Sequence, residues 1–182
     1  VYLGFAVVQQ QRAASVAAEM IAARAHVPVR QVVKPTLGNL LLWRSVYVHG
    51  GRIYVDAVRV GLFTDNRIYP GESVALYDLQ TDLADLDSAS TLGVDIRRFV
   101  HFSDGYVAFH PARPMVLGDM RYSMLPNAVT PLWGIVLDPD NPQRHAEYRF
   151  FRDSSRRVRQ AFINMLLGRC VAPECVSGAR RG

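Results

Sequence analysis

Apolar and polar residues alternate along two neighbouring segments, 42–48 and 53–59, which lie on either side of Gly50 and Gly51. Two adjacent glycines between β-branched runs are typical of a two-residue hairpin turn. Such a turn sets the cross-strand pairs His49–Arg52, Tyr47–Tyr54, Ser45–Asp56 and Trp43–Val58. The opposite face then carries Leu42, Arg44, Val46 and Val48 against Ile53, Val55, Ala57 and Arg59. The pattern therefore predicts a β-hairpin with one face that is apolar near the turn and basic at the open end.

The remainder of the chain predicts further strands and two helices. Four runs read as strands separated by proline-containing turns: GYVAFH, MVLGDMRY, LWGIVL and AEYRFF. YPGES at 69–73 reads as a proline–glycine turn, and DIRRFVHFSDG reads as a helix that ends near Gly105. A last helix follows, capped by Asp153 or Ser154 and stopped by Gly168. Its apolar stripe is Val158, Phe162, Met165 and Leu166. Six strands with flanking helices, and no βαβ alternation, predict an α+β fold with a mainly antiparallel β-sheet.

The first residues read as a helix, because QQQRAASVAAEMIAARA is rich in alanine and contains no glycine or proline. The apolar run VYLGFAVV before it resembles the last turns of a longer membrane helix, although an ordinary amphipathic helix fits these residues equally well. Basic residues follow the run, which under the positive-inside rule places the next domain on the cytoplasmic side. The predicted organisation is the end of a transmembrane or juxtamembrane helix (1–28), a single α+β domain (29–169) and a loose C-terminal tail (170–182).

Composition restricts the class of protein. With 182 residues and 49% apolar content, the chain can bury one compact core, and it matches neither a disordered tail nor a polytopic membrane protein. The net charge of +5 comes almost entirely from arginine, because Lys34 is the only lysine. These arginines are scattered and form no basic stripe with interleaved aromatic residues, so we expect no nucleic-acid partner.

The residue types of common catalytic and metal sites lack the spacing that such sites need. The five histidines form no ligand motif, and PGESVA lacks the second glycine of a nucleophile elbow. Cys170 and Cys175 would need two further ligands to hold zinc, and we expect them to be free thiols in the tail. The sequence thus predicts no metal or other cofactor for this fragment and leaves its catalytic residues unknown.

Arg44 and Arg59 are the most informative polar pair, because the predicted hairpin places them one strand apart on one face. Two guanidinium groups in this position could form an anion clamp for a phosphate or carboxylate. Alternatively, each could form a structural ion pair, since an unpaired buried charge is costly. The candidate carboxylates are Asp56, Asp104 and Asp119.

Five ordered blocks carry a resemblance to a known family: KPTLGNLLLWRSVY, GRIYVDAVRVGLF, YPGES, RFVHFSDGY and MRYSMLPN with PLWGIVLDP. They resemble the C-terminal extramembrane part of the YdjM-like family, LexA-regulated metal-dependent hydrolases of the bacterial inner membrane. The resemblance covers about residues 1–168. It implies that a divalent metal and its ligands belong to an N-terminal membrane-embedded part, so no catalytic residue can be assigned to a position here.

Two functions follow as expectations. The first is the C-terminal soluble domain of a membrane-bound metal-dependent hydrolase, attached to the inner membrane through its N-terminal helix. The second is a non-catalytic ligand- or partner-binding module attached to the membrane. Whether the fragment takes part in catalysis, and its substrate, stay undetermined by the sequence.

Overall fold

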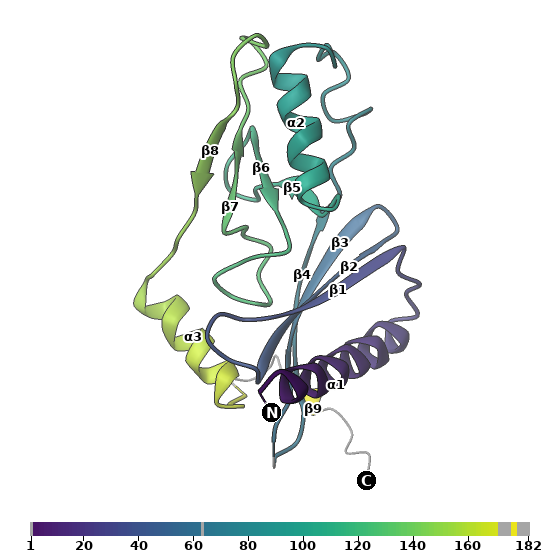
Figure 1. The fold of residues 1–182 in the computed structure, drawn as a ribbon, viewed down its shortest axis with the longest axis vertical. Helices are drawn as coiled ribbons and strands as arrows, with labels where there is room; N and C mark the ends of the chain where they lie inside the picture. Colours follow the sequence, from purple (N-terminus) through teal and green to yellow (C-terminus); the bar gives the residue numbers. More distant parts are fainter. Residues whose placement is uncertain (1, 63, 171–175, 178–182) are drawn as a thin grey trace.

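The computed structural model describes residues 2–62, 64–170 and 176–177 (Figure 1). In chain order the elements are α1 (Tyr2–Ala23), β1 (Arg30–Pro35), β2 (Leu42–His49), β3 (Arg52–Arg59), β4 (Arg67–Ala75), α2 (Thr91–Phe102), β5 (Val107–Phe109), β6 (Val116–Asp119), β7 (Trp133–Val136), β8 (Glu147–Phe150), α3 (Arg156–Leu166) and β9 (Val176–Ser177). The strands form two antiparallel sheets, one in the order β1-β2-β3-β4-β9 and one in the order β5-β6-β7-β8. The predicted α+β class with mainly antiparallel sheet is confirmed.

The central hairpin has the predicted register. Ser45 pairs with Asp56, Tyr47 with Tyr54 and His49 with Arg52. Gly50 and Gly51 have φ values of 55° and 71°, the left-handed conformation that a type I′ turn requires at both central positions. The alternation along β2 and β3 therefore decides which side chains lie on each face of the first sheet.

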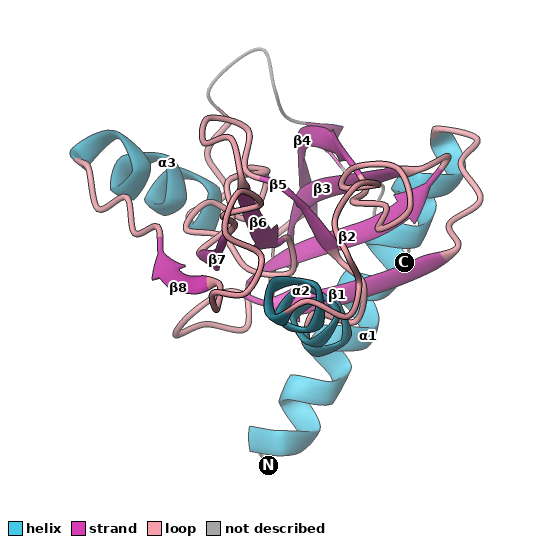
Figure 2. Ribbon diagram, turned by 90° about the horizontal axis from the view of Figure 1, so that it is seen from above, coloured by secondary structure: helices cyan, strands magenta, loops and turns pink. Residues whose placement is uncertain are grey.

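Helix α1 covers one face of the first sheet (Figure 2). Ala13 and Ala17 of the helix pack in one buried cluster with Trp43, Tyr47 and Val58. Small residues on the helix allow its backbone to approach the large side chains of the strands closely. The helix is additionally held by Gln9, whose buried side-chain amide donates to the carbonyl oxygen of Leu40 at 3.2 Å.

The other face of the first sheet packs against the second sheet. Val46 and Val55 form a buried cluster with Tyr106 and Met120, which flank the strands of the second sheet. Helix α2 then covers the second sheet, with Ile96 among its buried contacts. Toward the open end of the hairpin, a separate small cluster joins the first sheet to α3: Leu42, Ala57, Tyr69 and Met165.

Two strand segments differ from the sequence-based expectation. YPGES lies within β4 rather than in a turn, and Asp56 pairs with Pro70 where the β3–β4 register shifts. Gly71 and Glu72 together lie opposite Val55, which makes a β-bulge in the backbone ladder, and the Gly71 amide donates to the carboxylate of Asp56 at 2.9 Å. β1 was not predicted, because its sequence RQVVKP is short and ends in proline.

The helix boundaries also shift. α2 begins at Thr91 with Ser90 as its N-cap, before the predicted start at Asp95. α3 is capped by Ser155, whose side-chain oxygen accepts from the Val158 amide. Both caps follow irregular acidic segments in which several serines and aspartates compete for the same role.

At the ends of the chain, one expectation is corrected, which concerns Cys170. No helix among the described residues is both long and apolar enough to cross a bilayer. In the predicted loose tail, Val176–Ser177 pairs with β4, while most of residues 170–182 lie outside the described part. Cys170 is disulfide-bonded, so the expectation of a free thiol is wrong for this residue.

The bulge generates a stability prediction. A Cβ at Gly71 would lie well inside van der Waals contact of the carbonyl oxygens of Asn127 and Val55. Gly71→Ala should therefore lower the free energy of unfolding by about 2–3 kcal/mol, the usual cost of overpacking a rigid site. Chemical denaturation measures this change.

Gly4→Ala is the matched control, because no atom lies within 4 Å of its Cβ position and the residue is helical. It should leave stability unchanged or raise it slightly. Equal stabilities for the two variants would contradict the assigned close approach at Gly71.

Candidate functional site

Arg44 lies at the centre of the molecule with only 3% of its surface exposed. Its Nε and Nη2 donate to the Met120 carbonyl oxygen at 3.2 and 2.8 Å. Its Nη1 donates to the carbonyl oxygens of Pro126 at 2.8 Å and Ala128 at 2.9 Å. Backbone oxygens of the 120–128 loop thus occupy the guanidinium, which therefore forms neither half of an anion clamp nor an ion pair with the expected aspartates.

Arg59 does not form an anion clamp with Arg44 either. Its Nε donates to the Leu166 carbonyl oxygen at 2.8 Å, and its Nη1 donates to the Thr64 hydroxyl at 3.0 Å. Leu166 is the last residue of α3, where the unpaired carbonyls of a helix favour a cation. Arg59 therefore fastens α3 to the edge of the hairpin.

Asp56 is fully buried on the α1 face, opposite to Arg44, and pairs with Arg24. The two guanidinium nitrogens of Arg24 donate to its two carboxylate oxygens at 2.8 Å each. The hydrogen bonds that Arg24 donates to Asp56 raise the pKa of Arg24. The expected partner is wrong because residues that face each other across the two strands, Ser45 and Asp56, share the α1 face and not the face of Arg44.

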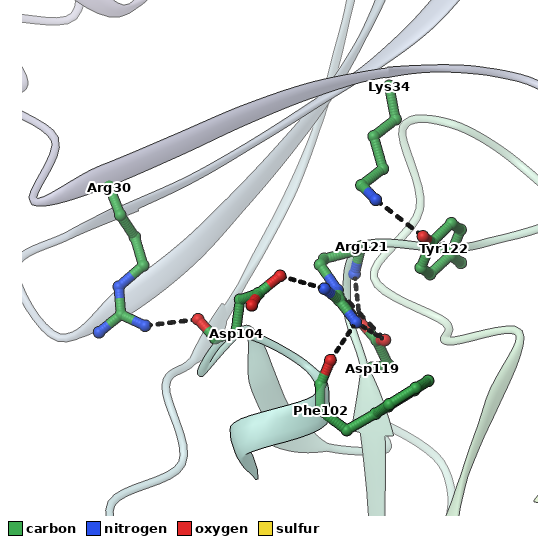
Figure 3. A network of polar contacts seen from close by, with 7 residues as sticks. All are labelled: Arg30, Lys34, Phe102, Asp104, Asp119, Arg121 and Tyr122. Atoms are coloured by element: carbon green, nitrogen blue, oxygen red, sulfur yellow. Dashed lines mark hydrogen bonds and ion pairs between the residues drawn. The ribbon is translucent and has the colours of Figure 1, made fainter. Parts of the chain in front are cut away.

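Asp119 and Asp104 both pair with Arg121 (Figure 3). Asp119 is fully buried and accepts from Arg121 at 2.8 Å. Arg121 also donates to the Phe102 carbonyl oxygen, and Arg30 of β1 donates to the Asp104 carbonyl oxygen at 2.7 Å. The aspartates are thus structural ion-pair partners of Arg121, which no sequence pattern had singled out.

A pocket of about 460 Å³ opens beside this network. Its walls come from β1 and the turn after it, the 121–124 loop, β7 and α3. Apolar and aromatic side chains dominate the lining, which also contains Ser123 and Thr36. Its basic members are Lys34, Arg44, Arg121 and Arg159, and the lining contains no aspartate or glutamate.

Lys34 and the aromatic wall form one connected group. The Lys34 ammonium donates to the Tyr122 hydroxyl at 2.7 Å and lies 4.6 Å from the ring centroid of Tyr122 (Figure 3). The Tyr122 ring in turn lies 4.5 Å from that of Trp133, centroid to centroid. The indole N–H of Trp133 is buried and has no acceptor within the described residues, an unusual state for a buried donor.

The charges around the pocket do not cancel. Arg121 is paired with two aspartates, of which Asp119 also attracts Arg44, whereas the ion pairs of the described residues include no carboxylate partner for Lys34, Arg44 or Arg159. Burial lowers the pKa of Arg44 to about 9, opposed by attraction to Asp119 and Asp56, so the side chain keeps its charge at neutral pH. Uncompensated cations beside low-dielectric walls give the pocket a positive potential.

A larger hollow of about 780 Å³ lies on the other side of α3, where Val158 borders both spaces. Its lining mixes Asp153 with Arg157 and Arg169, so it shows no preference for one sign of charge. Within the described residues, no three histidine, cysteine, aspartate or glutamate side chains are grouped so that they could hold a metal ion.

Sequence reasoning missed most of this pocket. Lys34 stood out as the only lysine, and Val158 and Phe162 were predicted as part of the α3 stripe. Nothing in the sequence connected them to Tyr122 or Trp133, because the five residues come from β1, the 121–124 loop, β7 and α3. An inward-facing lysine in a β-branched run was the one available signal.

The carbonyl contacts of Arg44 generate a stability prediction. Arg44→Met keeps the apolar stem but leaves the buried oxygens of Met120, Pro126 and Ala128 without a donor. We expect the free energy of unfolding to fall by about 3 kcal/mol, measured by chemical denaturation. Arg59→Met is the control and should lose only about 1 kcal/mol, since Arg59 is partly exposed. Wild-type stability of Arg44→Met would refute the assigned structural role.

Comparison of the chain with protein-family models, with curated proteins and with solved structures finds no match. The function is therefore argued from the geometry of the pocket.

Proposed function

We propose that the chain is a ligand-binding module and that the pocket between β1 and α3 is its binding site. The observation that carries this proposal is the combination of apolar walls with four basic side chains and no acidic one. The volume of about 460 Å³ falls in the range of small-molecule sites. Polar groups at few, fixed positions within an apolar recess are typical of such sites.

The contacts that hold the side chains of the pocket wall in place favour binding of a ligand to a preformed site. Arg121 is fixed by Asp119, and Arg44 is fixed by the backbone of the 120–128 loop. Side chains that are held by their own partners lose little conformational freedom when a ligand binds. The lining supplies hydrogen-bond donors and apolar surface, which bind and orient a ligand.

The proposal predicts that a bulky residue on α3 abolishes binding. Ile163 lines the pocket with 44% of its surface exposed, so Ile163→Trp can fill the space without disturbing a core. Screening the wild type by thermal shift against phosphorylated and lipid-like compounds should give stabilising ligands, and Ile163→Trp should remove that stabilisation.

Leu167→Trp serves as the matched control, because Leu167 is similarly exposed at 53% but does not line the pocket. It should respond to ligands like the wild type. A wild type that no compound stabilises, or a response that Ile163→Trp leaves intact, would exclude this pocket as the functional site.

A second candidate function concerns the membrane. Phe5, Val7 and Val8 of α1 are exposed large apolar residues, with Val7 and Val8 each 52% exposed. Figure 2 shows that this end of α1 extends beyond the sheets. We infer that it attaches the chain to the bacterial inner membrane, with the domain on the cytoplasmic side. The module then belongs to a membrane-bound metal-dependent hydrolase whose divalent metal is held outside these residues.

The membrane proposal predicts vesicle binding that depends on α1. Val7→Ser combined with Val8→Ser should reduce co-sedimentation with vesicles of phosphatidylethanolamine and phosphatidylglycerol severalfold, because it removes exposed apolar surface. Val29→Ser is the control, since Val29 is 78% exposed but lies outside α1 and does not line the pocket. Equal sedimentation of both variants would argue against attachment through α1.

A further inference from the structure

We infer that the ligand of the pocket is a single-chain amphiphile with an anionic head group, a hydrocarbon chain that ends in a carboxylate or a phosphate. The head group lies between Lys34 and Arg159, and the chain lies against the apolar wall beneath α3. This inference rests on the proposed ligand-binding function and gives it a chemical class of ligand.

The head-group site follows from donors that remain available. Lys34 uses one of its three N–H donors on the Tyr122 hydroxyl, which leaves two. Arg159 is exposed, and no contact among the described residues occupies its guanidinium. These cations belong to different walls, β1 and α3, of the same pocket. An anion between them would gain charge-assisted hydrogen bonds from both sides.

Arg44 and Arg121 attract the anionic head group through their electrostatic potential and not through hydrogen bonds. Their donors are taken by backbone carbonyls and by aspartates, respectively. Arg44 nevertheless forms no ion pair with a carboxylate among the described residues, and a low-dielectric surrounding screens its charge weakly. The wall behind the head-group site therefore favours an anion and disfavours a cationic amphiphile of the same shape.

The chain site follows from the apolar lining. Leu37, Met124, Leu132, Phe162 and Ile163 all border the pocket. Leu37 and Ile163 are among the exposed large hydrophobic residues of the chain, with 85% and 44% of their surfaces exposed. A hydrocarbon chain that covers them would remove apolar surface from water, worth about 25 cal/mol per Å². A small hydrophilic anion would leave this surface uncovered.

Helix α3 can adapt to hydrocarbon chains of different length, because the hydrogen bonds that hold it to the first sheet are concentrated at its C-terminal end. Arg59 binds the Leu166 carbonyl, and the Tyr69 hydroxyl donates to the carbonyls of Met165 and Arg169. Met165 is the only residue of α3 that is buried in the described structure. The first half of the helix, around Val158, borders hollows on both sides.

The test uses four probes that share one chain: dodecanoate, dodecyl phosphate, dodecanol and dodecyltrimethylammonium. Binding is followed below their micellar concentrations by calorimetry and by the fluorescence of Trp133 in the pocket wall. We expect both anions to bind, dodecanol to bind about tenfold more weakly, and the cation not to bind. Acetate and inorganic phosphate, which lack the chain, should not bind measurably.

The head-group residues are tested by Lys34→Met and Arg159→Gln. Each should weaken binding of both anions about tenfold while leaving dodecanol unchanged, because each removes one charged contact. Arg157→Gln is the matched control, since Arg157 lies on the same helix but lines the other hollow. Arg159 is exposed, so its variant tests the inference even where Lys34→Met fails to fold.

The outcomes separate the two proposals. Equal affinity for dodecanol and dodecanoate, or unchanged anion affinity in Arg159→Gln, overturns the anionic amphiphile. The anionic amphiphile is also overturned if a small hydrophilic anion or an oligonucleotide binds the wild type and Ile163→Trp blocks that binding. In that case the proposed binding function stands. Absence of any ligand sensitive to Ile163→Trp overturns the binding function and the inference together.

Discussion

Burial of the Arg44 guanidinium beneath backbone carbonyls is the constraint on which the rest of the structure depends. The side chain extends from strand β2 to the carbonyl oxygens of Met120, Pro126 and Ala128, so the 120–128 loop must pack over the first sheet. A buried cation is costly to desolvate unless polar groups surround it. Carbonyl dipoles solvate the cation without cancelling its charge. The same contact therefore fixes the loop that forms one pocket wall and leaves a net positive charge behind it.

The remaining arginines show why the chain uses this residue so often. Arg24 joins α1 to the bulge of the first sheet through Asp56, and Arg121 joins the second sheet to the end of α2. Arg59 holds the end of α3. A planar guanidinium with five donors can bridge several groups at once, which a lysine ammonium cannot do with the same geometry. Lys34 stands apart, because only one of its three donors has a hydrogen-bond partner among the described residues.

The loosely packed part of the molecule and the positively charged pocket lie at the same place, the junction of the two sheets and α3. The apolar clusters fix the sheets and α1 firmly, whereas α3 contributes a single buried residue and borders two hollows. A rigid floor with a loosely packed cover is typical of sites that admit a ligand. The described lining of the pocket includes no residue of α1, so the proposed membrane attachment and the proposed ligand binding use different residues.

The sequence by itself determined the α+β class, the register of the β2–β3 hairpin and the existence of α1 and α3. These features depend on periodicity and turn chemistry, which are local. It also placed Arg44 and Arg59 on one face correctly. Only the tertiary structure decided that Gly71 and Glu72 form a bulge, that Asp56 pairs with Arg24, and that Lys34 contacts Tyr122. The reason is physical: a charged side chain takes its partner from whichever segment packs against it, and here those segments lie up to 107 residues away in the chain.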